Sequence, residues 1–525
     1  MCAAALGGLL LACAFPDRGW WPLALPGIGL LVAGLYGRRT RPALLLGLVG
    51  GLAFFLSLVS WSSLFLGPVP YLALSIFCAL WWAASAAATA AALRGIARRY
   101  PQALARRLAP LAAAGLWTLR EALLSVWPYG GFAWGRVAQS QSASPFAELV
   151  SWLGLSGLGF LMVWAASAAA QALLPKPQAP PHSALPAAPA WPRLAAVLCG
   201  VALLAALPAF PVRQTGSLRI AAVQGATPQA GYFTPGERGE VLAEHLRATL
   251  EHVPPDAGVR LVLWPEGSVD LSPVRDPRVA QALSRLSARY DAPVVGNTVT
   301  LVPGADGGED RYYNSSFAWT AQHGWGAQYD KQHPVPFGEY IPDREFYALF
   351  APELVGLVQR GYTPGEGAVV LPLADSRAGV FICFDIVDDG LATRAVRDEG
   401  AQWLYAPTNN ADFGDTDELG QQLAFARLRA IETGRAIVQV STVGDSAVYG
   451  PDGRELASIP RLQEGAMIVD VPLSSGTTPA VLFGRGLEQA AGVLGTALLL
   501  GPRLGATGRA ARATRASGRD APAGS

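Results

Sequence analysis

Three ionisable side chains in the second half of this 525-residue chain stand in segments that place them at strand ends: Glu266, Lys331 and Cys383. A carboxylate, an ammonium group and a thiol together suit nucleophilic acyl transfer. The glutamate can take the thiol proton, the thiolate can attack a carbonyl carbon, and the lysine can stabilise the charge that develops on the carbonyl oxygen. These residue types at the ends of strands therefore predict an acyl-transfer site.

Cys383 follows the short apolar run 380–382, which predicts a buried strand, and precedes a plausible helix within 386–397. A cysteine before a helix faces the positive end of the helix dipole, which favours the thiolate. We therefore expect the pKa of Cys383 to lie below the roughly 8.5 of a free thiol. The other four cysteines lie in apolar segments, so the polar region cannot form an internal disulfide. The alternative is that Cys383 is simply a small buried hydrophobic residue.

Glu266 and Lys331 lie in different sequence contexts. Glu266 ends the run Leu263-Trp-Pro-Glu, and a glutamate between proline and glycine is by itself typical of a surface turn. Lys331 and Glu339 lie in the segment 329–342, which is rich in proline, glycine and aromatic residues. That context is unusual for charges that are merely solvated, and it favours a functional interpretation of the loop.

From Leu218 onward the pattern alternates between strands and helices. Strands are predicted at 218–223, 259–264, 293–299, 314–319, 379–382, 403–406, 436–441 and 467–471, and helices at 237–252, 276–289 and 418–433. This alternation predicts one mixed α/β domain over 211–475, which is within the usual size of a domain.

The first part of the chain has the composition of a membrane protein. Over the whole chain, 51% of residues are hydrophobic and 15% are charged, and the mean hydropathy is +0.29. Membrane helices are predicted near 1–14, 22–37, 43–61, 70–93, 109–126, 151–174, 194–210 and 480–501. We therefore expect a membrane domain of about seven helices over 1–210, and an eighth helix with a basic tail over 476–525. The net charge of +1 gives no basic field that would favour nucleic acid.

The arginines predict the orientation of the chain. They cluster between the second and third helices, between the fourth and fifth, and after the eighth. All three clusters fall on the cytoplasmic side if the N-terminus is inside, which places 211–475 outside the cytoplasm. The aromatic loop 127–144 would then lie at the outer interface, as a lipid headgroup contact or an ordinary aromatic anchor. The apolar loop 346–357 is either a lid that faces lipid or a helix docked on the core.

Several motifs resemble those of a known family. The α/β domain resembles the nitrilase, or carbon–nitrogen hydrolase, superfamily, which has an α-β-β-α sandwich, and the whole chain resembles the bacterial apolipoprotein N-acyltransferases. The matching pieces are Val223-Gln-Gly, Trp264-Pro-Glu266, Tyr329-Asp-Lys331-x-His-x-Val-Pro-Phe-Gly-Glu339-Tyr, Ile382-Cys383, Thr408-Asn409 and Ala426-Arg427-x-Arg429-Ala-x-Glu432-x-Gly434-Arg. The resemblance implies a nitrilase-like domain inserted in a membrane domain of about eight helices.

The resemblance also implies a role for each site residue. Glu266 would be the general base, Lys331 the oxyanion stabiliser and Cys383 the nucleophile, and Glu339 would help to place the lysine. The residues expected to contact substrate are Phe384, Asp385 and Asn409. The family usually has Cys-Tyr-Glu where this chain has Cys383-Phe384-Asp385, and Asn-x-Ala-Trp where it has Asn409-Asn-Ala-Asp412. No metal or organic cofactor is implied, because none of the five histidines forms a ligand-spaced pair with cysteine.

The implied reaction has two steps and two lipid substrates. Cys383 would take an acyl chain from a phospholipid, phosphatidylethanolamine being the expected donor, and hold it as a thioester. The α-amine of a diacylglyceryl-cysteine at the N-terminus of an apolipoprotein would then accept it. The expected location is the bacterial cytoplasmic (inner) membrane, with the catalytic domain on its outer side.

Two alternatives remain open from the sequence. A membrane-anchored amidase or nitrilase would share the same three residues, with water as the acyl acceptor. A non-catalytic membrane scaffold with a decayed hydrolase domain is the other. Decay should have removed at least one of Glu266, Lys331 and Cys383, and all three are present.

Overall fold

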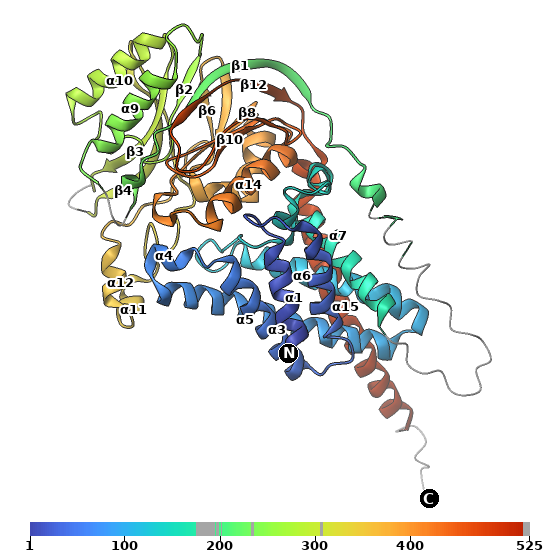
Figure 1. Cartoon of the computed structure of the whole chain (residues 1–525). Coiled ribbons are helices and arrows are strands. Elements are labelled where there is room, and N and C mark those ends of the chain that lie inside the picture. Colours follow the sequence, from blue (N-terminus) through green and yellow to red (C-terminus); the bar gives the residue numbers. More distant parts are fainter. Residues whose placement is uncertain (175–194, 196–198, 201, 233–235, 305–307, 518–525) are drawn as a thin grey trace, which may run out of the picture.

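The computed structural model describes residues 1–174, 195, 199–200, 202–232, 236–304 and 308–517. Two parts lie one above the other in Figure 1. The helical part consists of helices from the first 174 residues together with the C-terminal helix. The α/β part, 213–475, lies above it.

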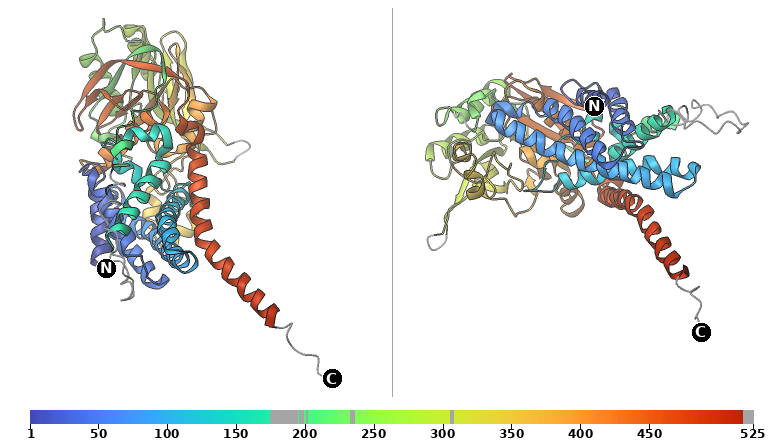
Figure 2. Two further views of the ribbon diagram at one scale, coloured as in Figure 1. Left: turned by 90° about the vertical axis from the view of Figure 1, so that its right-hand side faces the viewer. Right: turned by 90° about the horizontal axis from the view of Figure 1, so that it is seen from below.

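The helical part is built from long apolar helices joined by short turns. Its members are α1 (Cys2–Cys13), α2 (Ala24–Ala33), α3 (Thr40–Leu58), α4 (Ser62–Leu66), α5 (Pro68–Arg99), α6 (Gln102–Leu124), α7 (Val150–Leu173) and α15 (Pro479–Ser517), with short 3-10 turns η1 (Trp21–Leu23), η2 (Val137–Gln141) and η3 (Ala147–Leu149). Figure 2 shows α15 running away from the α/β part and beyond the other helices.

Small residues let two of these helices approach closely. A Cβ added to Gly47 of α3 would lie 2.6 Å from the Cβ of Ala86 on α5, and one added to Gly51 would lie 3.0 Å from the Cα of Ala79. Close approach through glycine and alanine is typical of helix pairs in membranes, where dispersion contacts replace the hydrophobic effect.

Three helical stretches of the described chain are long and apolar enough to cross a membrane: Thr40–Leu58, Pro68–Arg99 and Ala147–Leu173. Two shorter apolar helices, Cys2–Cys13 and Trp21–Ala33, correspond to the first two predicted spans. The stretch predicted at 480–501 lies within α15, and the one predicted at 109–126 overlaps α6 and extends two residues past its end. The helix predicted at 194–210 falls in part on residues outside the described ones. A total of eight spans therefore stays a prediction.

Two six-stranded sheets form the α/β part. The first has the order β12-β1-β2-β3-β4-β5 and the second the order β11-β10-β9-β8-β7-β6. The strands are β1 (Arg213–Gln224), β2 (Leu261–Leu263), β3 (Val294–Val302), β4 (Arg311–Thr320), β5 (Gly324–Asp330), β6 (Val370–Leu373), β7 (Ser376–Val380), β8 (Trp403–Thr408), β9 (Ile437–Ser441), β10 (Ser446–Tyr449), β11 (Glu455–Ile459) and β12 (Gly465–Ser475).

Alternation along β1 explains how the layers stack. Ile220 and Ala222 pack into the core that also contains side chains of the second sheet. Ala221 and Val223 pack into a second core, with residues of helices α9 (Glu240–His252) and α10 (Pro277–Tyr290). Successive side chains of a strand point to opposite faces, so both faces of the first sheet are covered. Helix α14 (Asp417–Thr433) covers the second sheet, against β9 and β10. The layers are thus helix, sheet, sheet and helix (Figure 1).

The predicted α/β elements are present, with shifted ends. The eight predicted strands and three predicted helices correspond to strands β1 to β4, β7 to β9 and β12 and to helices α9, α10 and α14. Strands β5, β6, β10 and β11 had not been predicted. The apolar loop at 346–357 contains two short helices, α11 (Arg344–Ala348) and α12 (Pro352–Leu357). In Figure 1 these two helices descend beside the sheets to the level of α4 and α5.

Candidate active site

Glu266, Lys331 and Glu339 form one buried charge cluster. Lys331 Nζ lies 3.4 Å from Glu266 Oε1 and 2.8 Å from Glu339 Oε2. Asn314 of β4 donates its side-chain amide to both carboxylates, at 2.7 Å to Glu266 and 3.1 Å to Glu339. The three charged residues are only 2 to 6% exposed. Glu266 follows β2 and Lys331 follows β5, so the first sheet brings them together although they are far apart in sequence.

Burial and the neighbouring opposite charge shift the pKa of Glu266, and that of Lys331, in opposite directions. Burial raises the pKa of Glu266, Lys331 lowers it and Glu339 raises it again, and the net shift is upward. For Lys331, burial alone would lower the pKa, but the two carboxylates outweigh it and hold the pKa well above its usual value. The site therefore combines a permanent cation with a carboxylate whose proton affinity suits a general base.

Cys383 lies at a strained turn after β7. Its φ is +50°, a left-handed conformation that residues other than glycine rarely adopt. The turn continues as η6 (Cys383–Val387), a 3-10 segment, then as α13 (Asp389–Thr393) and the π-helical η7 (Arg394–Asp398). The helix predicted within 386–397 is present as α13 and its π-helical continuation η7, but the 3-10 segment η6 separates it from Cys383. Strain of this kind is concentrated at functional sites, where the surrounding structure maintains it.

The prediction of a lowered thiol pKa is wrong. Burial and the nearby Glu266 carboxylate raise the pKa of Cys383 to about 12, although Lys331 and a hydrogen bond with Thr408 act in the opposite direction. The helix dipole that was expected to favour the thiolate does not arise, because only a short 3-10 turn begins at this residue. Cys383 therefore rests as a thiol and needs a base to activate it.

Side chains from α14 and β8 surround the sulfur. Gln422 Nε2 lies 3.6 Å from Cys383 Sγ and also donates to the hydroxyl of Thr408. The Gln422 carbonyl accepts a hydrogen bond of 2.9 Å from Asn410, whose amide also donates to Glu418 at 2.7 Å. Sequence reasoning missed Gln422 and Asn314 as site residues. For Gln422 a signal was present: Glu418, Gln421 and Gln422 stand at i, i+3 and i+4 and form a polar face on the first half of the helix.

The structure places the three residues expected to contact substrate in different environments. Asp385 is completely buried and accepts hydrogen bonds from Tyr329 Oη at 2.7 Å and from the backbone N–H of His333 at 2.8 Å. Asp385 thus connects the turn at Cys383 to the loop that carries Lys331. Asn409 is half-buried and donates to the carbonyl of Ala230 at 2.8 Å.

The third residue, Phe384, faces the helical part. Its ring lies parallel to that of Trp134, with centroids 6.4 Å apart and an interplanar angle of 7°. Trp134 belongs to the loop 127–144, so this loop partly packs against the α/β part, while Trp127 is exposed. Asp412, at the position where the family usually has tryptophan, accepts a hydrogen bond of 2.6 Å from the backbone of Tyr232.

A cavity of about 350 Å³ lies where the helical part meets the α/β part. Phe384 and Val387, from the turn that begins at Cys383, line it together with charged residues of both signs. The ionisable residues of the lining are Arg136, His333, Asp388, Asp389, Glu432, Arg485 and Glu488. The cavity therefore adjoins the turn that begins at Cys383, but its lining does not include Glu266, Lys331 or Cys383.

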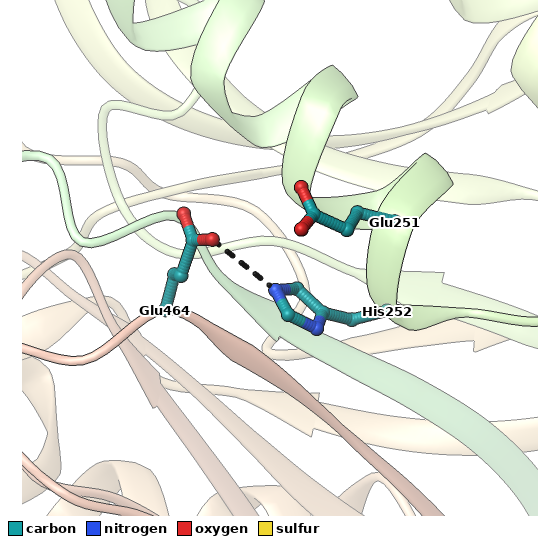
Figure 3. A group of neighbouring side chains, drawn as sticks. All are labelled: Glu251, His252 and Glu464. Carbon is teal, nitrogen blue, oxygen red and sulfur yellow. Dashed lines mark hydrogen bonds and ion pairs between the residues drawn. The ribbon is translucent and has the colours of Figure 1, made fainter.

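One group in the described part of the chain has the composition of a metal site. Glu251 and His252 at the end of α9 lie near Glu464, just before β12 (Figure 3). Arg247 already forms ion pairs with both glutamates, at 3.0 Å to Glu251 and at a shorter distance to Glu464. His252 Nε2 lies 3.3 Å from Glu464. The guanidinium neutralises the carboxylates that a cation would need, so we assign no metal to this group.

Comparisons with known proteins agree with this architecture. Residues 7–168 match the family model of the apolipoprotein N-acyltransferase N-terminal domain, and residues 219–478 match that of carbon-nitrogen hydrolase. The apolipoprotein N-acyltransferase of Mycolicibacterium smegmatis is 32% identical, over 95% of this chain and 84% of that protein. That of Ralstonia nicotianae is 30% identical, over 94% of this chain and 91% of the relative.

Solved structures give a weaker likeness. The carbon-nitrogen hydrolase from Helicobacter pylori G27 aligns with a TM-score of 0.35 and 17% identity, over 52% of this chain and 93% of that one. The two family models and the near full-length relatives carry the assignment. The chain belongs to the apolipoprotein N-acyltransferase family, and it is a membrane enzyme of lipoprotein N-acylation with a carbon–nitrogen hydrolase domain.

Proposed function

We propose that this protein moves an acyl chain from a phospholipid to the N-terminal amine of a diacylated apolipoprotein, through a thioester on Cys383. The observation that carries the proposal is the buried cluster of Glu266, Lys331 and Glu339, whose charges act on a thiol held at a strained turn. A permanent cation, a base and a thiol are the parts that acyl transfer needs.

In the first step the thiol attacks an ester of the phospholipid. Glu266 takes the proton from Cys383 as the sulfur bonds to the ester carbonyl carbon, and Lys331 stabilises the negative charge on the carbonyl oxygen. The carbon–oxygen bond to the glycerol then breaks, and Glu266 returns the proton to the leaving oxygen. The products are a thioester on Cys383 and one lysophospholipid.

In the second step an amine replaces the sulfur. The neutral α-amine of the diacylglyceryl-cysteine attacks the thioester carbonyl, again with Lys331 at the oxygen. Glu266 takes a proton from the nitrogen, and the proton passes to the departing sulfur of Cys383. The product is an amide, and the free thiol is regenerated.

Glu339 keeps the lysine in place between the two steps. Its Oε2 atom lies 2.8 Å from Lys331 Nζ and also accepts the backbone N–H of Val335 at 2.7 Å. Because the carboxylate is held by its own loop, it can hold Lys331 in one position while Glu266 gains and loses a proton. This role supports the assignment of Glu339 as a positioning residue.

The surroundings of the turn support a lipid as the acyl donor. The cavity beside Phe384 carries both cationic and anionic side chains, including Arg485 on α15 and Asp388 on the nucleophile turn. A zwitterionic headgroup such as that of phosphatidylethanolamine has complementary charges. A cavity of about 350 Å³ lies within the range of roughly 300–1,000 Å³ that is usual for small ligands.

Exposed apolar side chains on the α11–α12 arm, residues 344–357, support the proposal that this arm contacts the membrane surface. Leu349 is 79% exposed and Phe350 is 74% exposed, and Phe346 and Leu357 are also exposed. The arm descends to the level of the membrane-domain helices α4 and α5 (Figure 1). Of the two interpretations of this loop, exposed apolar groups at that level favour the lid that faces lipid, rather than the helix docked on the core.

We place the α/β part on the outer side of the cytoplasmic membrane. The N-terminus lies at the end of the helical part that is farther from the sheets (Figure 1). Arginines follow α2 and flank the junction of α5 and α6, and such basic loops favour the cytoplasmic side. Both lipid substrates would then reach the site from the outer leaflet.

Separating the two half-reactions tests the proposal against a hydrolase. Purified wild-type protein with phospholipid alone should form one thioester on Cys383 and one equivalent of lysophospholipid, and then stop. A diacylated peptide with a free N-terminal amine should discharge the thioester into an amide, as mass spectrometry would detect. Cys383→Ala should form neither product. Continuous release of fatty acid without peptide would instead mean that water is the acceptor.

A further inference from the structure

Gln421 of α14 connects the α/β part to the helical part through four buried hydrogen bonds. Its Oε1 atom accepts the indole N–H groups of Trp61, at 3.2 Å, and of Trp134, at 2.6 Å. Its side-chain amide donates to the carbonyl of Leu58 at 3.0 Å, and its backbone carbonyl accepts from the Gln139 amide at 3.0 Å. All four partners belong to loops and helix ends of the helical part, and Gln421 is only 1% exposed.

The next residue, Gln422, faces the nucleophile. Its amide lies 3.6 Å from Cys383 Sγ and also donates to Thr408, while its carbonyl accepts from Asn410. Consecutive helix residues point about 100° apart, so one turn of α14 presents one glutamine to the membrane helices and the other to the sulfur. A shift of the first glutamine must move the second, because the helix backbone joins them rigidly.

Trp134 provides a second connection between Gln421 and the turn at Cys383. The Trp134 indole that Gln421 holds also lies parallel to Phe384, the residue after Cys383, and packs at 5.3 Å against Phe425 of α14. One side chain of the helical part thus touches both the nucleophile turn and the helix that carries Gln422. The position of Trp134 relative to Cys383 therefore depends on its hydrogen bond with Gln421.

We propose that Gln421 is a positioning residue through which the membrane helices set the Gln422 amide against the Cys383 sulfur. The proposal rests on Cys383 being the nucleophile and adds the residue that couples the membrane domain to it. Gln422 acts on the sulfur by donating a hydrogen bond, which stabilises the thiolate as Glu266 removes its proton. Gln421 acts only through Gln422 and Trp134, since none of its own bonds reaches the sulfur.

The test compares Gln421→Leu with Gln421→Glu in the purified full-length protein. Leucine has a similar size and cannot form any of the side-chain hydrogen bonds. Glutamate keeps acceptor oxygens for the two indoles and loses the donor to Leu58. The matched control is Asp17→Asn, which weakens a different contact between the two parts, a two-pronged ion pair with Arg461 at 2.7 and 2.9 Å.

Two readouts separate positioning from general support of the fold. The first is the rate of Cys383 alkylation by iodoacetamide across pH, quantified on the Cys383 peptide by mass spectrometry. Loss of one hydrogen bond to a charged group should slow it about tenfold in Gln421→Leu. The second is acyl-enzyme formation, in which a misplaced group should lower kcat on the order of 10²-fold while KM stays near the wild-type value. Gln421→Glu should recover most of both, and Asp17→Asn should change neither.

Wild-type values for Gln421→Leu in both assays would overturn the proposal, as would equal losses in Gln421→Leu and Asp17→Asn. If Gln421→Leu does not fold, Trp134→Phe removes one indole N–H and keeps an aromatic ring beside Phe384. The same slower alkylation is expected there, and an unchanged rate would also refute the coupling. Alkylation does not require substrate, so the test remains informative even if Cys383 forms no acyl adduct and the proposed function fails.

Discussion

Replacing Glu339 by glutamine should change the rate, the pH profile and the stability together. The two Glu339 oxygens receive three donors: Asn314 on one, and Lys331 and the Val335 N–H on the other. A glutamine has one carbonyl oxygen and one NH₂ group, so in either orientation a donor must face another donor. The substitution also removes one of the two carboxylates that hold Lys331.

The pH effect follows from the geometry. Glu266 Oε1 and Glu339 Oε1 both accept from Asn314 Nδ2, at 2.7 and 3.1 Å, which places the two oxygens within about 6 Å of each other. At an effective dielectric constant of 20, two like charges at that distance repel by about 3 kcal/mol. Glu339 raises the pKa of Glu266, so its neutralisation should lower that pKa. The acidic limb of the pH–rate profile should therefore move to lower pH.

The other two effects come from the lysine. Removing one partner of a buried ion pair typically costs about 3–5 kcal/mol, and we expect about 3 kcal/mol because Glu266 still lies 3.4 Å from Lys331 Nζ. A less well placed oxyanion stabiliser should slow thioester formation on the order of 10²-fold. The assays are thermal unfolding of the solubilised protein and the pH dependence of lysophospholipid release.

Glu366→Gln is the matched control, because Glu366 is an exposed glutamate of the same part of the chain. It should leave all three quantities near their wild-type values. The reasoning is refuted if Glu339→Gln keeps the wild-type rate, or if the acidic limb stays in place or moves to higher pH. A shift of the acidic limb to higher pH would mean that the two carboxylates do not repel each other across Asn314.

Three further predictions follow from the site. Glu266→Gln should abolish acyl-enzyme formation yet speed Cys383 alkylation at a given pH, because the Glu266 charge raises the pKa of the thiol; slower alkylation in a site-specific mass-spectrometric assay would contradict this sign. Lys331→Met should lower the rate of thioester formation on the order of 10²–10³-fold, measured as lysophospholipid release, and an active variant would exclude the lysine as oxyanion stabiliser. Single cysteines placed on exposed positions in 211–475 should react with an impermeant reagent in intact cells, whereas labelling of the 94–107 loop instead would reverse the orientation.

Glu266, Lys331, Glu339 and Cys383 could be proposed as site residues from the sequence because each lies in a short, distinctive segment. Trp264-Pro-Glu266 ends an apolar run, and the loop of Lys331 and Glu339 is dense in proline, glycine and aromatic residues. Strands of the α/β part were equally visible, since their apolar runs are bounded by polar turns. The missed strands β6, β10 and β11 have four or five residues each, too few for a clear period.

The tertiary structure decided what these residues are next to. Asn314 joins two carboxylates, and Gln422 reaches the sulfur, because sheet pairing and helix packing bring segments together that are far apart in the chain. The tertiary structure also gives the Cys383 pKa a shift in the direction opposite to the one expected from the sequence. The local sequence suggested a helix that would favour the thiolate, but the pKa depends on burial and on Glu266, which is more than a hundred residues away in the chain. Desolvation and charge act through space. The sequence can therefore indicate which ionisable residues belong to a site, but their pKa values depend on neighbours that only the tertiary structure provides.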